Sequence, residues 1–375
     1  MIACGGSESG SRSATPAAPG ASDVGAFRSL APDWATDFTR ASVAAGEFRS
    51  GGPGKDGIPA IDEPRFVGIE EAEFLSDVDP VLAVEVDGEA RAYPLQILIW
   101  HEIVNDVIAG KPVAVTYCPL CNSSLVFERT VGTAVLDFGV SGFLRNSDLV
   151  MFDRQTESWW QQVTGDAVVG QYTGTALEVI PASTIAFSEF KDAYPEGLVL
   201  SRETGFDRSY GRSPYSGYDT PGNDPFLFDG DVDGRLDAVD RVVAVEIGTE
   251  AVAYPFSRLL EHPAVNDAIG GEPIVVFYRP GVASPLDRSA IADSKDVGQG
   301  VVFRRAVKDR VLTFESTSDG FRDQQTGSTW SITGRANEGP LKDTQLEPVI
   351  HGNHFWFAWA VFKAQTRVWQ SEEAP

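Results

Sequence analysis

The sequence predicts an α+β protein, rich in β-strands, built from two tandem homologous domains. One pattern occurs twice, and every motif in it is displaced by the same distance along the chain: Ala-Tyr-Pro, a histidine, Val-Asn-Asp, a proline and Tyr-x-Pro. The copies begin at residues 92 and 253. Most segments between the motifs are short apolar runs bounded by Gly, Asp or Pro, which is typical of strands. Because like units commonly associate symmetrically, we expect pseudo-two-fold packing of the two domains.

The first copy predicts a hairpin, a short helix and further strands, in that order. Residues 80–86 and 90–93 flank an Asp-Gly dipeptide, which favours a tight hairpin turn. Pro94 can open the helix because proline is tolerated at the first helical position. The apolar residues that follow it give the helix a buried face, and His101 lies near its end. Further strands are predicted at 112–117, 124–128, 134–139 and 148–152.

The second copy predicts the same plan. Its strands are expected at 241–247, 251–254, 273–278, 301–306 and 310–314, with a helix from Pro255. The connector is rich in Tyr, Gly, Pro and Asp, and its aromatic side chains have apolar area to bury, so we expect an ordered wrap. The predicted division of the chain is 1–26, an N-terminal tether; 27–201, the first repeat; 202–240, the connector; and 241–375, the second repeat.

The charge balance excludes one class of partner. The chain has 54 acidic and 30 basic residues, a net charge of −24. Such a surface repels phosphate backbones and anionic membranes, so we expect no nucleic acid partner. Cations and basic proteins are more compatible with it. A solvated acidic surface is the simplest interpretation of the charge itself.

The segment 1–26 is expected to lie outside the fold. Met-Ile-Ala-Cys-Gly-Gly, followed by a Ser, Gly, Ala and Pro-rich run, resembles the end of a bacterial lipoprotein signal. Cys4 would then be the lipidated residue, and the protein would be extracytoplasmic, either periplasmic or on the cell surface. The usual charged and apolar regions do not precede Cys4, so a disordered cytosolic N-terminus is the alternative. The later sequence contains no apolar run of the ~20 residues that a membrane helix needs, so the predicted membrane attachment is the lipid.

The cysteines distinguish the two copies. Cys118 and Cys121 of the first copy correspond to Arg279 and Val282 of the second. A duplication that keeps its framework while one copy lacks a Cys-x-x-Cys pair separates scaffold from candidate chemistry. We therefore expect the functional site at this pair.

A transition metal site is the leading interpretation of the pair. Two thiolates two residues apart can hold one ion, and His101 from the preceding helix would add an imidazole of the kind that zinc and copper accept. His351 and His354, three residues apart, are candidate donors from the second copy. The aromatic run that follows them equally favours a core helix. His262 stands in the place of His101 in the copy without cysteines, which supports a scaffold role for this histidine.

Other interpretations of Cys118 and Cys121 remain open. They could form a redox dithiol in a thiol–disulfide oxidoreductase, or a structural disulfide in a non-catalytic binding module. Their predicted place between two strands differs from the helix start that lowers the thiol pKa in such oxidoreductases. Cys118 could also act as a hydrolytic nucleophile with His101 as base.

A second metal candidate lies in the connector. Asp229, Asp231 and Asp233, followed by glycine, have the spacing of an EF-hand-type calcium loop. The flanking segments are not helical, and the twelfth position is Asp instead of Glu. A solvated turn is therefore favoured over a calcium site.

Five motifs together resemble the prokaryotic family catalogued as domain of unknown function 3179. They are His-Glu-Ile-Val-Asn-Asp (101–106), Tyr-Cys-Pro-Leu-Cys-Asn-Ser (117–123), Asp-Arg-Gln-Thr-Glu-Ser-Trp-Trp (153–160), Tyr-Gly-Arg-Ser-Pro-Tyr (210–215) and Phe-Trp-Phe-Ala-Trp (355–359). The resemblance covers the chain from about residue 58 to its end. It implies no agreed reaction, so the function must come from the residues. They predict a membrane-tethered extracytoplasmic protein that binds copper or zinc.

Overall fold

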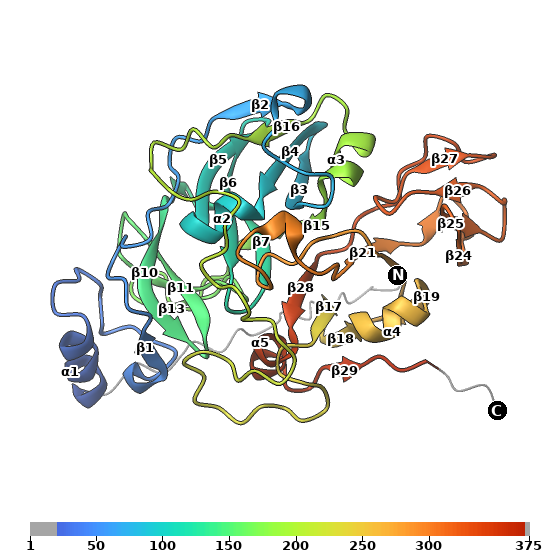
Figure 1. Ribbon diagram of the computed structural model, residues 1–375. Helices are drawn as coiled ribbons and strands as arrows, with labels where there is room; N and C mark the ends of the chain where they lie inside the picture. The colour runs from blue at the N-terminus through green and yellow to red at the C-terminus, as the bar shows by residue number, and fades with distance from the viewer. Residues whose placement is uncertain (1–20, 372–375) are drawn as a thin grey trace, which may run out of the picture.

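The protein is built mainly from small β-sheets. The computed structural model describes residues 21–371, and 41% of the structure is strand and 13% helix. The predicted β-rich fold with few helices is confirmed. In Figure 1 the strands of the first half, blue to green, gather on one side, and the orange and red strands of the second half lie on the other.

Two sheets form much of the first half, and the Cys-x-x-Cys segment is a turn in one of them. Their strands are β2 (Phe66–Gly68), β3 (Pro80–Val86), β4 (Glu89–Pro94), β5 (Ile103–Ile108), β6 (Lys111–Cys118), β7 (Ser123–Glu128), β14 (Glu178–Ile180), β15 (Ala182–Ala186) and β16 (Leu198–Leu200). One sheet has the order β14-β7-β6-β5 and the other β15-β3-β4-β16-β2. All their pairs are antiparallel except β16 with β4.

The predicted hairpin and helix before the cysteines are confirmed. β3 and β4 are joined by Asp87 and Gly88, whose φ angles are 49° and 85°. Positive φ at both positions defines a type I′ turn, whose twist matches that of the strands. Helix α2 (Leu95–His101) follows, with Pro94 as its N-cap residue and Glu102 in the left-handed conformation at its C-cap. Because nearly every side chain of α2 is buried, it is a core helix and not an amphipathic surface helix.

A third sheet of the first half packs against the N-terminal segment. Its strands are β1 (Phe48–Ser50), β10 (Phe138–Arg145), β11 (Asp148–Asp153), β12 (Trp159–Gln161) and β13 (Ala167–Val169), in the order β1-β10-β11-β12-β13. The strand predicted at 134–139 is instead the short β9 (Ala134–Val135), paired with β8 (Thr130–Val131), followed by the longer β10. Helix α1 (Ala21–Leu30) buries Phe27 beside Trp159. The expected tether boundary at residue 26 therefore falls inside a helix, and Cys4 lies outside the described residues.

The described part of the second half contains three larger sheets and the two-stranded sheet of β22 (Ala306–Val307) and β23 (Arg310–Val311). Its elements are β17 (Arg241–Ile247), β18 (Glu250–Pro255), α4 (Phe256–Glu261), β19 (Ala264–Ile269), β20 (Glu272–Arg279), β21 (Gln299–Arg304), β24 (Phe314–Thr317), β25 (Gly320–Asp323), β26 (Thr329–Trp330), β27 (Ala336–Glu338), β28 (His351–Phe355), α5 (Trp356–Phe362) and β29 (Arg367–Val368). The sheet orders are β28-β17-β18-β29, β19-β20-β21 and β24-β25-β26-β27. The remaining elements are η1 (Ala45–Glu47), η2 (Ile69–Glu71), α3 (Phe187–Ala193) and η3 (Ile291–Asp293).

Strand pairing follows the same register in the two halves. Val81 pairs with Pro94, and Val242, at the equivalent position of the second copy, pairs with Pro255. The same displacement relates the pairing of β5 with β6 to that of β19 with β20. The displacement seen between the sequence motifs therefore also holds between hydrogen-bonded strand pairs.

The two halves share their apolar interior. β15 contacts β21, and β7 contacts β28. One buried cluster includes Val81 and Ile185 of the first half together with Phe277 and Phe303 of the second. The two halves therefore share a hydrophobic core, and the Cys-x-x-Cys segment belongs to a first half that packs against the second.

The connector forms the ordered wrap that its composition predicts. Tyr210, Tyr215, Tyr218 and Phe228 are half-buried and pack against the cluster that contains both cysteines. Phe226 is the exception, since its side chain is 49% exposed.

Among the helices of residues 21–371, none is long and apolar enough to cross a membrane.

Candidate metal centre

The Cys-x-x-Cys segment forms the tight turn between β6 and β7. Cys118 is the last residue of β6 and pairs across the turn with Ser123. Asn122 adopts a φ of 48° and donates its backbone N–H to the carbonyl oxygen of Pro119 at 3.2 Å. The backbone carbonyl of Cys121 accepts a hydrogen bond from the N–H of Phe355 at 2.9 Å. The second half of the chain thus fixes the turn that holds the cysteines.

A second turn, between β10 and β11, faces the cysteines. Its central residues, Asn146 and Ser147, have φ angles of 53° and 65°, a type I′ arrangement that is uncommon for serine. The carbonyl oxygen of Ser147 lies 3.6 Å from Sγ of Cys121 and 4.0 Å from Sγ of Cys118. Asp148 follows this turn as the first residue of β11.

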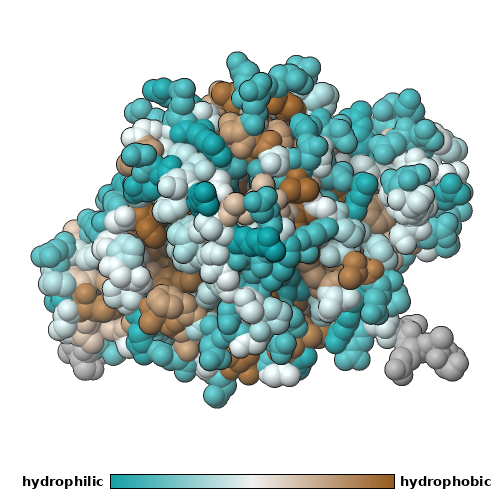
Figure 2. Space-filling model, in the orientation of Figure 1, coloured by the Kyte–Doolittle hydropathy of each residue, from teal (hydrophilic) through white to brown (hydrophobic). Residues whose placement is uncertain are grey.

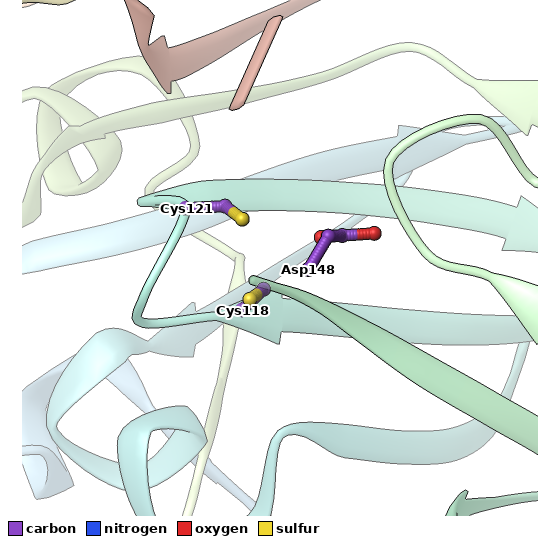
Figure 3. A group of neighbouring side chains, drawn as sticks. All are labelled: Cys118, Cys121 and Asp148. Atoms are coloured by element: carbon purple, nitrogen blue, oxygen red, sulfur yellow. The ribbon is translucent and has the colours of Figure 1, made fainter. Parts of the chain in front are cut away.

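Cys118, Cys121 and Asp148 converge in the interior (Figure 3). Their two sulfur atoms and one carboxylate oxygen all lie within 4.8 Å of one another, and all three residues are buried. Within residues 21–371 no other group of three or more His, Cys, Asp or Glu side chains meets this spacing. Both cysteines are free thiols. We call these three residues the thiol–carboxylate cluster.

The two oxygens of the Asp148 carboxylate differ in their hydrogen bonding. Its Oδ2 accepts hydrogen bonds from Nε2 of Gln161 at 2.5 Å and from the N–H of Val163 at 3.0 Å. Within residues 21–371 its buried Oδ1 has no hydrogen-bond partner. Since an unpaired buried acceptor is costly, such an atom needs an explanation. A metal ion bound by the cluster would supply one.

Burial keeps the two thiols of the cluster protonated in the absence of a cation. It raises the pKa of the Cys118 thiol, and it raises the pKa of Cys121 well above the usual value for a thiol. It also raises the pKa of Asp148 to about 6 and that of the neighbouring Glu102 to about 8. The negative charge of Asp148 raises the pKa values of Glu102 and of the two thiols further. A divalent cation would favour the ionised forms of the ligands.

The expected ligand His101 is not brought to the cysteines. Its Nδ1 donates to the carbonyl oxygen of Pro59 at 2.7 Å, which leaves Nε2 to accept from the hydroxyl of Tyr210 at 2.6 Å. Both ring nitrogens are therefore engaged at the end of α2. The carboxylate of Asp148 occupies the third position in the cluster instead, and His101 ties α2 to the connector.

His351 and His354 also lie outside the cluster. Both are on strand β28, not on the helix that follows it. Nδ1 of His351 donates to the carbonyl oxygen of Val349 at 2.7 Å, while the ring of His354 stacks on Trp359 with centroids 5.5 Å apart. Burial lowers the pKa of His351 to about 4 and that of His354 to about 3. Both side chains are therefore neutral at ordinary pH.

The connector aspartates do not gather around a common point. Asp229 forms an ion pair with Arg49 at 2.5 Å, and Asp233 forms one with Arg235 at 2.7 Å. Asp231 is exposed to solvent. Among the described residues these carboxylates form no group with metal-ligand spacing. The structure places them in a solvated turn.

Sequence reasoning missed two acids, Glu102 and Asp148. Glu102 carried a usable signal, because the equivalent position of the second copy is Pro263, so this acid also distinguishes the two copies. Asp148 is distinguished by the length of its hairpin, which is longer than the corresponding hairpin of the second copy. β11 begins five residues before Asp153, whereas β25 begins three residues before Asp323.

The two aspartates at the ends of these hairpins show that the hairpins correspond. Asp153 accepts a hydrogen bond from the indole N–H of Trp160 at 3.0 Å, and Asp323 accepts one from Trp330 at the same distance. Both aspartates are also bonded to the threonine three residues on. The carboxylate of Asp148 thus lies in an extension of the first hairpin that the second hairpin lacks.

Fold and site together define a β-rich protein of two linked halves with one buried thiol–carboxylate cluster in its described part. The chain belongs to the family described as Protein of unknown function (DUF3179), whose model matches residues 55–366. This confirms the resemblance seen in the motifs, and the match includes every residue of the cluster. No curated protein and no solved structure matches the chain.

Proposed function

We propose that this protein binds one transition metal ion at Cys118, Cys121 and Asp148. The supporting observation is the convergence of two sulfur atoms and one carboxylate oxygen within 4.8 Å in a buried position. Two thiolates and a carboxylate form a donor set that zinc accepts, with a fourth position left for another ligand. Copper is the second candidate. The carboxylate favours zinc, since copper(I) prefers softer donors.

A thiol–disulfide oxidoreductase is the competing function. It is favoured by the two free thiols that lie side by side in one turn. Against it, burial raises the pKa of both thiols, whereas attack on a disulfide requires a thiolate. Metal binding also gives the carboxylate of Asp148 a role as the third ligand beside the two sulfur atoms, so it accounts for all three converging groups.

Metal content of protein purified without oxygen separates these functions. We expect one equivalent of zinc or copper in the wild-type protein, loss of that metal in Cys118→Ser, and a reduced metal content in Asp148→Asn, which should bind the ion more weakly. Asp166→Asn is the matched control, because this carboxylate is exposed in the turn after β12. Wild-type protein that stays metal-free when supplied with zinc under reducing conditions would contradict the proposal. A readily reducible disulfide between Cys118 and Cys121 in that protein would support the oxidoreductase.

We further infer that the protein works outside the cytoplasm, held to the membrane by a lipid on Cys4. The lipoprotein-like residues around Cys4 support this inference. Fractionation of cells that express the wild-type protein or Cys4→Ser tests it. Membrane association lost in the variant is the expected result, and equal distribution of both proteins would contradict it.

We also infer that the halves arose by duplication and are related by a pseudo-two-fold axis. Support comes from the motifs repeated at a constant displacement and from the strand pairs that keep this displacement. An experimental structure tests the axis, because superposition of residues 80–118 on 241–279 should require a rotation near a half-turn. A rotation far from that would contradict it.

A further inference from the structure

A cavity of about 280 Å³ lies beside the thiol–carboxylate cluster. Its walls come from five separate parts of the chain, which include residues 51–58 and Glu102. Leu120 comes from the Cys-x-x-Cys turn, Phe143 from an irregular part of β10, and Tyr215, Tyr218 and Phe226 from the connector. On the face drawn in Figure 2, hydrophobic surface gathers in a hollow at the left, over the region where β10 and β11 lie in Figure 1.

β10 departs from regular pairing where it borders this cavity. The register with β11 shifts between Val140 and Leu144, which leaves two extra residues on β10. Gly142 has a φ of 81° within this bulge, and an added Cβ there would collide with the carbonyl oxygen of Pro53. Bulges redirect side chains next to functional sites. Here the bulge forms one wall of the cavity.

Glu102 supplies the one carboxyl group in the cavity wall. Only 6% of its surface is exposed, and within residues 21–371 its carboxyl makes no hydrogen bond. The backbone of Glu102 is fixed on both sides, since its N–H donates to Leu98 at 2.6 Å and its carbonyl accepts from Tyr117 at 2.8 Å. Its φ of 58° is one that glycine or asparagine adopts more readily, so helix termination does not explain a glutamate here.

We propose that this cavity binds a small apolar molecule that carries a protonated amine, with the ammonium group on Glu102. A buried carboxylate is stable when it is paired with a cation, and Glu102 has no such partner in the described chain. Aromatic rings attract cations through their faces, and Tyr215, Tyr218 and Phe226 also contribute to the wall. The net charge of −24 would raise the local concentration of a cationic ligand.

The size and walls of the cavity restrict the ligand. Sites for drug-sized molecules begin at roughly 300 Å³, so a single ring or a short alkyl chain is the expected size. The wall residues other than Glu102 are apolar, aromatic or glycine. An anion would find no cationic side chain in the wall, and the charge of the neighbouring Asp148 disfavours it. Because the cluster residues do not line the cavity, the proposal does not require bound metal.

Three probes of one shape test the proposal: 2-phenylethylammonium, the neutral 2-phenylethanol and the anion phenylacetate. Binding to the full chain is measured by calorimetry at pH 7, with and without zinc. We expect the ammonium to bind at least tenfold more tightly than either of the others. Failure of the ammonium to bind at millimolar concentration, or equal binding of the alcohol, would overturn the proposal.

Two variants localise the binding. Glu102→Gln keeps the shape of the side chain and should weaken ammonium binding at least tenfold, while Glu261→Gln, at an exposed position, should leave it unchanged. Phe226→Ala alters an exposed wall residue, so it should fold normally and weaken binding severalfold. Unchanged binding in Glu102→Gln or in Phe226→Ala would overturn the assignment. Cys118→Ser, which should lose metal, is expected to keep ammonium binding, so the two proposals can fail separately.

Discussion

The sulfur of Cys121 lies 3.6 Å from the carbonyl oxygen of Ser147, which joins the β6–β7 turn to the β10–β11 turn. A carbonyl oxygen can only accept, so this contact favours the protonated thiol. Burial acts in the same direction on the pKa of Cys121. In the metal-free protein both thiols are therefore protonated, and a metal ion must displace these protons to bind.

Zinc binding at pH 7.5 should release about two protons, because thiolate ligands bind in their deprotonated form. Both thiols have a raised pKa, whereas the pKa of Asp148, about 6, leaves this carboxyl mostly ionised at that pH. Calorimetry in buffers with different ionisation enthalpies measures the number. In Asp148→Asn the number should stay the same while the affinity falls. Binding without proton release would show that the thiols are not the ligands.

Glu102→Gln should make the folded protein more stable at alkaline pH. The folded-state pKa of Glu102, about 8, lies above its unfolded value near 4.5, so the stability it contributes is complete below pH 4.5 and is lost as the pH rises through 8. The free energy of unfolding, measured in urea, should match the wild type at pH 5 and exceed it by on the order of 3 kcal/mol at pH 9. The exposed Glu261→Gln serves as control. A difference independent of pH would contradict the assignment.

His354→Phe should reduce the sensitivity of the protein to acid. The folded-state pKa of His354, about 3, lies below its unfolded value near 6.5, so its contribution is present above pH 6.5 and is lost as the pH falls towards 3. Phenylalanine keeps a ring to stack on Trp359. The quantity to compare is the free energy of unfolding of the variant minus that of the wild type. This difference should be higher at pH 4.5 than at pH 7 by on the order of 2 kcal/mol. His262→Phe, at an exposed position, should show no such gain.

Asp153→Ala should destabilise the fold without removing the metal site. The change leaves the indole N–H of Trp160 and the N–H of Thr156 without an acceptor in the interior. We expect a loss of about 2–4 kcal/mol in the free energy of unfolding. Asp323→Ala should cost a similar amount in the second half. Metal content of the folded Asp153→Ala protein should equal that of the wild type, and loss of metal would show that Asp153 supports the cluster.

Local signals predicted the first half of the site. The Asp-Gly dipeptide at 87–88 specified a type I′ hairpin, and Pro94 marked the start of α2. Strand β5 was missed because Asn105 and Asp106 interrupt its apolar pattern. Both are buried, and Asn105 exchanges hydrogen bonds with the backbone of Phe138, a partner that sequence spacing does not reveal.

The third residue of the cluster depended on long-range pairing. Asp148 reaches the cysteines through the β10–β11 hairpin, which follows the Cys-x-x-Cys turn only after three other strands. His101 turns away because its ring bonds to Tyr210 of the connector, far along the chain. Spacing along the sequence suggested a histidine as the third ligand. The pairing of the strands and the packing of the connector instead place Asp148 beside the cysteines.

The hydrogen bond from Phe355 to Cys121 also has a consequence for biosynthesis. Ribosomes make chains from the N-terminus, so both cysteines are made long before β28, the strand that completes their turn. Contacts between such distant segments form late in folding. A nascent chain therefore has its thiols in an unfinished turn, where metals and oxidants in its surroundings can reach them. Synthesis must reach β28 before the turn is complete, so the thiols gain their final enclosure late in the production of the chain.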